Sequence, residues 1–306
     1  MRAYLTIEDE YRCCRLCPRN CGADRLHGIY GACGMGAEIT AARAALHFWE
    51  EPCISGKEGS GTVFFSGCPL GCVFCQNREI SGNHTGRVID TDRLADIFLE
   101  LQEQQANNIN LVTAVHYVPS VVKALETAKE KGLGIPVVYN SSGYESVRTL
   151  QMLDGLVDIW LPDFKYIDPE PAARYSRCPD YPERAKEALA ELVRQAGAPV
   201  FDNRGLMKRG VIVRHLVLPG QTGNAKRVIR YLHDTYGDAV YISIMNQYTP
   251  MPGIGEKYPE LAGRVSEQAY EKVLDFAARI GVEKGFRQEG GTYLESFIPA
   301  FDLQGI

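Results

Sequence analysis

The chain has 306 residues, enough to bury one large core, and an ordinary 45% of them are hydrophobic. The 33 lysines and arginines and the 38 aspartates and glutamates give a formal net charge of −5, which argues against a nucleic-acid partner. No apolar run approaches the length of a membrane span, and the polar N-terminus is unlike a signal peptide, so we expect no membrane partner.

The ten cysteines are clustered, which predicts metal ligation in a reducing cytoplasm rather than disulfide bonds. The first cluster contains four thiols that could close a metal site, namely Cys14, Cys17, Cys21 and Cys33. Four soft ligands suit a structural metal, and zinc and a second iron–sulfur cluster both fit them. Reduced, unligated cysteine is the alternative. We therefore predict a Cys-rich, metal-binding segment over residues 1–58, followed by a larger domain over residues 59–306.

A second cysteine cluster follows a short apolar stretch, residues 62–65, that predicts a buried strand. Cys68, Cys72 and Cys75 are separated by three and then two residues, on a loop bent by glycine and proline. Thiolates at this spacing suit zinc or an iron–sulfur cluster. Three ligands leave one coordination position open, which favours catalysis over a structural role. The alternative is a zinc loop that a distant cysteine or histidine completes.

Apolar stretches and helical patterns alternate along the rest of the chain. After residues 62–65, the predicted strands are 109–115, 134–139, 156–161, 210–218 and 239–245. The predicted helices are 91–105, 119–131, one beginning near residue 144, 182–196, 224–236 and 266–280. This alternation predicts an α/β fold with a parallel sheet and right-handed crossovers. Active-site residues of such folds lie where the strands end.

The spacing of Cys68, Cys72 and Cys75, with the aromatic Phe74 before the third cysteine, resembles the radical SAM superfamily. The resemblance implies a partial (β/α)6 TIM-like barrel in which the three cysteines hold a [4Fe-4S] cluster. It also implies that S-adenosylmethionine (SAM) chelates the fourth iron, with Phe74 near this cofactor. An electron from a donor such as flavodoxin or ferredoxin would then split SAM and generate a 5′-deoxyadenosyl radical that abstracts hydrogen.

Four segments in order are similar to uncharacterised homologues of pyruvate formate-lyase activating enzyme: CxxCPxxC, HFxEEPCISG, GSGTxFFSGC and CxFCQN. This resemblance covers nearly the whole chain. It implies an oxidoreductase that installs a glycyl radical on a partner enzyme. Radical chemistry on a small molecule or a peptide is a second hypothesis, and a non-catalytic zinc- or iron–sulfur-binding protein is a third. Within HFxEEPCISG, His47, Glu50, Glu51 and Cys53 could line the cluster mouth, although we expect most of them in a packed linker.

Polar residues follow the second and third predicted strands. Activating enzymes usually carry Gly-Gly-Glu after the second strand, for the amino group of SAM, and this chain lacks it. Thr113 and His116 are the polar candidates left there, and a structural role for His116 is the alternative. After the third strand, where activating enzymes carry Thr-Asn-Gly, Asn140 and Ser142 offer uncharged groups for SAM. A helix N-cap is the alternative role for Ser142.

The later strands end in charged and amide side chains. Asp163 and Lys165 resemble the Asp-x-Lys signature of activating enzymes, and their charges would match the zwitterionic end of SAM. A surface ion pair is the alternative. Arg214 lies in an apolar strand and needs a carboxylate or a ribose hydroxyl as partner. Asn246 and Gln247 follow the sixth strand, where activating enzymes place a polar residue that contacts SAM.

Overall fold

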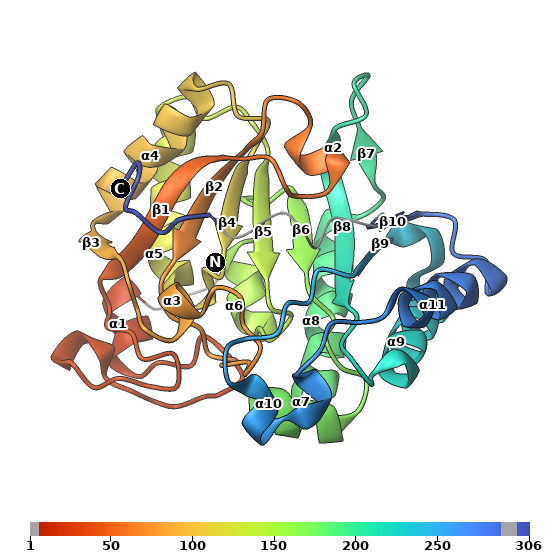
Figure 1. The fold of residues 1–306 in the computed structure, drawn as a ribbon. Coiled ribbons are helices and arrows are strands. Elements are labelled where there is room, and N and C mark those ends of the chain that lie inside the picture. The colour runs from red at the N-terminus through yellow and green to blue at the C-terminus, as the bar shows by residue number, and fades with distance from the viewer. Residues whose placement is uncertain (1–5, 289–298) are drawn as a thin grey trace.

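The computed structural model describes residues 6–288 and 299–306 (Figure 1). Its centre is a curved sheet with the strand order β10-β9-β8-β6-β5-β4-β2-β1-β3. Six neighbouring parallel strands correspond to the six predicted ones: β2 (Ser60–Phe65), β4 (Ile109–Val112), β5 (Val137–Ser141), β6 (Ile159–Pro162), β8 (Met207–Leu216) and β9 (Tyr241–Met245). The prediction of a partial (β/α)6 barrel is therefore confirmed.

Four further strands extend this sheet beyond the prediction. β1 (Ile39–His47) pairs antiparallel with β2, and β3 (Arg87–Ile89) pairs antiparallel with β1. At the other edge β10 (Gly285–Arg287) runs parallel to β9, and β7 (Val200–Phe201) pairs with β8. β1 is rich in alanine and mostly buried on both faces, so neither β propensity nor alternation marks it in the sequence. The boundary predicted at residue 58 thus falls after a strand of the barrel sheet.

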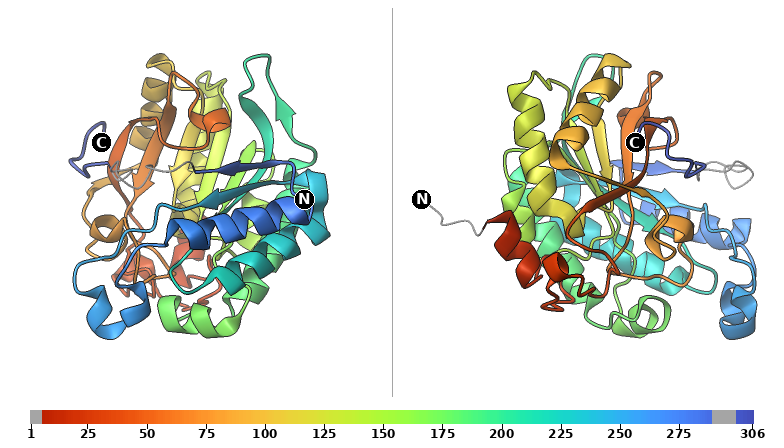
Figure 2. Two further views of the ribbon diagram at one scale, coloured as in Figure 1. Left: turned by 45° about the vertical axis from the view of Figure 1, so that its right-hand side comes forward. Right: turned by 90° about the vertical axis from the view of Figure 1, so that its left-hand side faces the viewer.

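Helices cover the outer face of the sheet (Figure 2). The larger ones are α4 (Thr91–Glu103), α5 (Val118–Glu130), α6 (Val147–Met152), α7 (Pro169–Ser176), α8 (Tyr181–Ala196), α9 (Thr222–Tyr236) and α11 (Glu267–Arg279). In α4, the Asp90 side chain accepts a hydrogen bond from the Arg93 N–H at 2.7 Å and caps the helix. Leu94, Ile97 and Phe98 then face the core at helical spacing. No helix among the described residues is both long and apolar enough to span a membrane.

Two boundaries differ from the prediction near the site. β4 ends at Val112 rather than residue 115, because Thr113 adopts a left-handed conformation with φ of 62° and Val115–Tyr117 form a 3-10 turn. A β-branched residue at positive φ is strained, and the surrounding structure has to hold it there. The helix expected near Tyr144 begins at Val147. Helix α7 was not predicted.

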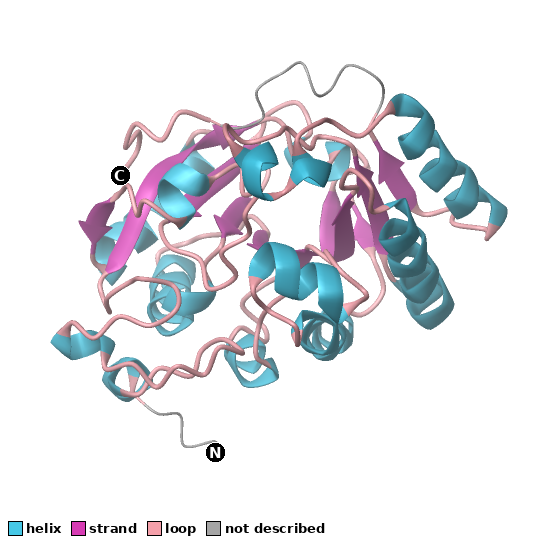
Figure 3. Cartoon of the chain, turned by 60° about the horizontal axis from the view of Figure 1, so that its bottom comes forward, coloured by secondary structure: helices cyan, strands magenta, loops and turns pink. Residues whose placement is uncertain are grey.

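A short helix plugs one end of the barrel. α2 (Pro52–Ser55) follows β1 and brings Cys53 and Ile54 into a buried cluster with residues of β5, β6 and β8 such as Val138, Leu161 and Ile212. In Figure 1, α2 lies at the end of the sheet opposite α3 (Arg78–Ser81), α7 and α10 (Ile254–Lys257). The barrel interior is therefore closed at the amino ends of the parallel strands. Figure 3 views the opposite end, where their carboxyl ends lie.

The N-terminal segment packs beside this carboxyl end. Its helix α1 (Ile7–Arg12) begins with a capping box between Thr6 and Asp9. Tyr11 Oη and Ser120 Oγ, at the start of α5, are hydrogen-bonded at 2.8 Å. Arg148 forms a bidentate pair with Glu10. These contacts attach the cysteine-rich segment to the same side of the barrel as the Cys68–Cys75 loop.

Candidate active site

A cavity of about 540 Å³ occupies the carboxyl end of the barrel. Predicted site residues line it from the cluster loop and from five strand ends: Cys68, Cys72, Phe74, Cys75, Thr113, Asn140, Ser142, Asp163, Lys165, Arg214 and Gln247. A volume of this size suits one small organic ligand. The fold therefore brings together residues that are separated by as much as 179 positions in the sequence.

The cysteine loop carries hydrogen-bond donors for its sulfur atoms. Backbone N–H groups of Leu70 and Gly71 bond Cys68. Ser176 Oγ donates to Cys72 Sγ at 3.1 Å, and Ser81 Oγ donates to Cys75 Sγ at 3.3 Å. Burial and neighbouring thiols raise the pKa of Cys68 to about 12. Hydrogen-bond donors of this kind stabilise the charged thiolate form of cysteine. The thiolate is the form that binds a metal, and burial alone would disfavour it.

The three loop thiols suit an iron–sulfur cluster, whose irons are bound one to each thiolate, so the sulfur atoms need not converge on one point. Among the described residues, no three histidine, cysteine or acidic side chains converge closely enough to hold one metal ion. The three loop cysteines nevertheless line one cavity mouth, and in a [4Fe-4S] cluster each thiolate binds a different iron. Phe74 packs edge-on between Tyr175 and Tyr248, with ring centroids 6.5 and 6.4 Å away, and so anchors the loop.

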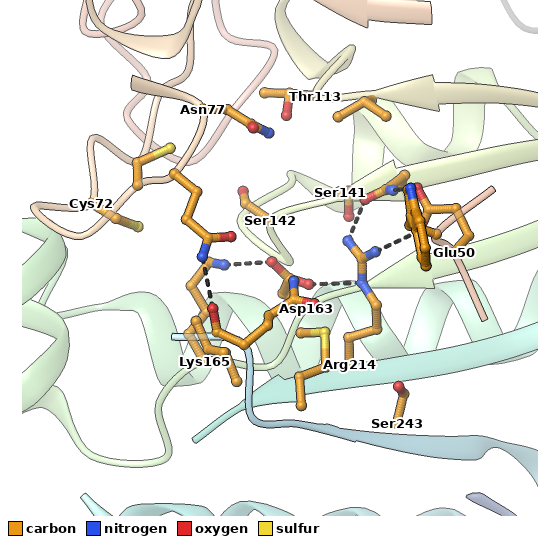
Figure 4. Close-up of a pocket in the computed structure, with 18 of the residues that line it drawn as sticks. Glu50, Cys72, Asn77, Thr113, Ser141, Ser142, Asp163, Lys165, Arg214 and Ser243 are labelled. Carbon is orange, nitrogen blue, oxygen red and sulfur yellow. Dashed lines mark hydrogen bonds and ion pairs between the residues drawn. The ribbon is translucent and has the colours of Figure 1, made fainter. Parts of the chain in front are cut away.

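A row of charges crosses the cavity from the cysteines toward its floor (Figure 4). Lys165 Nζ donates to Asp163 Oδ2, and Arg214 Nε donates to Asp163 Oδ1 at 3.1 Å. Burial tends to raise the pKa of Asp163, but the two adjacent cations outweigh burial and hold it below its ordinary value. The Asp163 side chain is only 16% exposed, so the pair lies inside the cavity and not on the outer surface.

Close backbone approach fixes this row in place. The Phe164 N–H donates to the Arg214 carbonyl at 2.8 Å. This bond aligns β6 with β8 at the position where the Asp163 and Arg214 side chains enter the cavity. A Cβ atom on Gly143 would lie 2.1 Å from the Asp163 carbonyl oxygen, and Gly143 has a φ of 76°. Glycine is therefore required where the β5 loop meets the end of β6.

Glu50 lines the cavity and is one of four residues that could line the cluster mouth by sequence, although most of them were expected in a packed linker. Its carboxylate accepts from Arg214 Nη1 at 3.0 Å, Asn110 Nδ2 at 3.0 Å and Asn140 Nδ2 at 3.2 Å. Arg214 therefore has two carboxylate partners, as its burial requires. The signal available in the sequence was a pair of acids, Glu50 and Glu51, placed before Pro52 and the apolar α2.

Glu51 adds a second buried carboxyl group at the floor. It is 8% exposed, and its Oε2 atom has no hydrogen-bond partner among the described residues. Burial raises the pKa of Glu51, Arg214 opposes that shift, and Glu50 adds to it. The floor of the cavity thus offers one open hydrogen-bonding position beside the satisfied Glu50.

Two predicted residues do not line the cavity. His116 is buried behind the loop, where Nε2 lies 2.7 Å from the Ser66 carbonyl, and burial lowers its pKa to about 3. The 3-10 turn after Thr113 carries it there, so the structural alternative describes its position better. Asn246 donates its backbone N–H to Gln288 Oε1 at 2.6 Å. Gln247 does line the cavity, and its carbonyl accepts from Gln76 Nε2 at 2.7 Å.

The N-terminal cysteines lie outside this cavity. Cys14 and Cys33 are buried, Cys17 is partly buried and Cys21 is exposed. Burial and the neighbouring Cys33, Cys14 and Cys21 thiols raise the pKa of Cys17 to about 12. The four predicted ligands are thus neighbours, although their side chains do not converge on one point.

The sequence model of the Radical SAM superfamily matches residues 62–232, more than half of the chain. The chain belongs to the radical SAM superfamily. Its members are enzymes that use a [4Fe-4S] cluster and SAM and that need a reductant such as flavodoxin or ferredoxin. The matched residues contain most of β2, the cysteine loop, and strands β4, β5, β6 and β8.

An uncharacterised protein of Methanocaldococcus jannaschii is 28% identical over 281 residues, which cover 89% of this chain and 76% of that protein. Among solved structures, Streptococcus suis SuiB bound to SAM aligns with a TM-score of 0.51 at 10% identity, over 74% of this chain. A second crystal structure of Streptococcus suis SuiB aligns with a TM-score of 0.49 at 10% identity, over 74% of this chain and 48% of SuiB. The chain spans about half (49%) of the SAM-bound SuiB chain, and the likeness concerns the fold.

Proposed function

We propose that this enzyme cleaves SAM reductively at a [4Fe-4S] cluster held by Cys68, Cys72 and Cys75, and abstracts a hydrogen atom from a partner protein in the manner of an activating enzyme. The observation that carries the proposal is that the three thiols line the same cavity as the Asp163–Lys165 pair, which Figure 4 shows together with Cys72. A cluster alone needs no such pair, whereas a zwitterionic cofactor beside the cluster does.

Asp163 and Lys165 are suited to hold the methionine end of SAM. Their charges match its ammonium and carboxylate groups, and both side chains are about 15% exposed, so water competes little for them. Arg214 keeps Asp163 ionised and oriented from the side opposite Lys165. Thr113, Asn140 and Ser142 add uncharged groups along the cavity wall, which suit a ribose or an adenine edge.

The bound cofactors supply the electron and the carbon-centred radical that takes the hydrogen atom, while the protein supplies placement and exclusion of water. The α2 plug closes the barrel floor, and the aromatic packing of Phe74 holds the loop at the mouth. Water therefore has to enter from the carboxyl end. An electron donor such as flavodoxin or ferredoxin would dock near that end, where the cysteine loop lies.

The glycyl-radical role rests on the similarity of the sequence segments to activating-enzyme homologues. A cavity of about 540 Å³ is within the range that one drug-sized ligand fills. SAM would occupy much of it, so the group that loses hydrogen has to be small or to enter as a protein loop. A second candidate, a small polar substrate, is favoured by the open oxygen of Glu51.

Anaerobic reconstitution tests the proposal directly. The loaded, reduced protein is expected to convert SAM to 5′-deoxyadenosine and methionine. Deuterium transfer into 5′-deoxyadenosine from labelled candidate substrates then separates the two candidates, together with an EPR search for a glycyl radical on a co-expressed partner. Full iron and sulfide loading without any 5′-deoxyadenosine, with or without substrates, would refute the proposed chemistry.

A further inference from the structure

The N-terminal segment contains a buried arginine, Arg25, for which the described part of the chain offers no carboxylate partner. Arg25 is only 2% exposed, and within residues 6–288 and 299–306 no aspartate or glutamate forms an ion pair with it. Its guanidinium donates hydrogen bonds to the carbonyl oxygens of Met35, Gly36 and His116. A further contact, at 3.7 Å, joins Arg25 Nη1 to the Cys14 sulfur. Arginine is rarely buried to this degree without an anion, so its counter-charge has to come from another group.

The groups that surround Arg25 and can become anionic are two thiols and one phenol. Cys14 contacts its guanidinium, and Cys33 and the phenol of Tyr11 interact with it electrostatically. Cys17 in turn interacts with Cys14, Cys21 and Cys33. The backbone also brings Cys21 to the segment that leads to Cys33, because a Cβ atom on Gly31 would lie 2.3 Å from Cys21 Sγ.

The chain already presents N–H donors to two of these sulfur atoms. The Arg19 N–H bonds the sulfur of Cys17, and the Met35 N–H bonds the sulfur of Cys33. In each case the donor lies two residues after the cysteine. The Leu70 N–H bonds Cys68 in the same way in the catalytic loop. An N–H donor in such a turn stabilises a negatively charged thiolate more than it stabilises a neutral thiol.

We propose that Cys14, Cys17, Cys21 and Cys33 bind one divalent, thiophilic ion of the zinc class, and that Arg25 balances part of its charge. Four thiolates and one divalent ion carry two net negative charges, and Arg25 removes one of them. The site is closed, so it is structural and takes no substrate. The proposal does not depend on the radical chemistry, because the zinc content of the protein can be measured in the absence of SAM.

Binding has to draw the thiols together, because among the described residues no three of them converge on one point. Cys21 is the exposed member and can swing toward the other three at least structural cost. A single ion needs only the space between four sulfur atoms, whereas a four-iron cluster needs a cavity. The cavity of the barrel does not extend to these cysteines.

The test uses the full chain with the catalytic loop silenced by Cys68→Ala, Cys72→Ala and Cys75→Ala, so that no iron binds there. Metal analysis of this variant should give about one zinc per chain. Adding Cys21→Ser should abolish stoichiometric zinc, whereas Cys13→Ser, a change at the exposed neighbouring cysteine, should leave it unchanged. Circular dichroism establishes that each variant is folded. Equal zinc in the Cys21→Ser and Cys13→Ser variants would overturn the proposal.

Two further measurements sharpen the assignment. Arg25→Met should weaken zinc binding by about 10- to 100-fold in a chelator competition, the usual effect of removing a group that supports metal ligands. Cobalt titration should give the visible absorption of tetrahedral thiolate coordination, and Cys21→Ser should eliminate it. Iron with acid-labile sulfide in place of zinc, in the variant without the catalytic cysteines, would overturn the single-ion assignment.

Discussion

Replacing Asp163 by asparagine removes the negative charge at the centre of the row that crosses the cavity. The carboxylate has two cationic neighbours, Lys165 on one side and Arg214 on the other. Asparagine keeps the shape and one oxygen, so Arg214 can retain its hydrogen bond, and Arg214 also keeps its bond to Glu50 at 3.0 Å. Lys165, in contrast, loses its carboxylate and faces the cavity alone.

The expected loss follows from these contacts. One hydrogen bond between charged groups contributes about 1.5–3 kcal/mol, and the same amount applies to the bond that Asp163 would make to the ammonium of SAM. The dissociation constant for SAM should therefore rise by about 10- to 100-fold. Stability should also fall, because Lys165 is left without a carboxylate partner, whereas Arg214 keeps its bond to Glu50.

The assay is calorimetric titration of SAM into the anaerobically reconstituted variant, with iron and sulfide measured to show that the cluster is intact. Asp168→Asn is the matched control, because Asp168 pairs with Arg227 on the exposed surface. That change should leave SAM affinity as it is in the wild type. If Asp163→Asn binds SAM as tightly as Asp168→Asn does, Asp163 is a structural ion-pair residue and the assignment of the cavity to SAM fails.

Two other predictions concern the loop and the wall of the barrel. Cys72→Ala should abolish both [4Fe-4S] assembly and 5′-deoxyadenosine formation, and iron that stays at the wild-type level would contradict the ligand assignment. Burial raises the pKa of Glu145 to about 8, and the hydrogen bond from Ser141 partly offsets this shift. Between pH 4.5, the ordinary pKa of the carboxyl group, and about pH 8, the folded state therefore keeps a proton that the unfolded state has lost. The free energy of unfolding should therefore decrease as the pH rises from 4.5 to about 8, and Glu145→Gln should flatten this dependence in denaturant titrations at several pH values. An equally steep slope in the variant would show that Glu145 is not the group responsible.

Local patterns in the sequence were sufficient for most of the fold and for the loop. The six parallel strands are short apolar runs between helical patterns, and Cys68, Cys72 and Cys75 lie within eight residues, so their proximity needs no tertiary information. Asp163 and Lys165 alternate along one extended segment and therefore point the same way. Periodicity failed at β1, where burial on both faces removes the alternation.

The floor of the cavity could not be predicted, because it depends on where the chain passes through the barrel. Glu50 is 164 residues from Arg214 in the sequence, and only the insertion of α2 into the barrel end makes them partners. His116 shows the opposite case, because one residue in a left-handed conformation, Thr113, turns the chain away from the cavity. Strand ends are thus a good guide to candidates, but the first backbone reversal decides which of them face inward.

Arg19 connects the two cysteine regions, and this connection gives a last prediction. Its guanidinium donates to the Pro69 carbonyl at 3.0 Å and the Leu70 carbonyl at 3.4 Å on the catalytic loop. It also donates to the carbonyls of Ser176 and Arg177 at 3.2 and 2.8 Å, at the end of the helix whose serine bonds Cys72.

Because Arg19 lies between Cys17 and Cys21, ordering of that segment should hold the catalytic loop. Arg19→Ala should therefore make the [4Fe-4S] cluster leave faster under a chelator, while zinc content stays unchanged. Arg19→Lys keeps the charge but not the fork of donors, so it should restore little. Arg15→Ala, at an exposed neighbouring position, is the control. Cluster loss at the same rate in the Arg19 and Arg15 variants would show that the N-terminal segment does not support the catalytic loop.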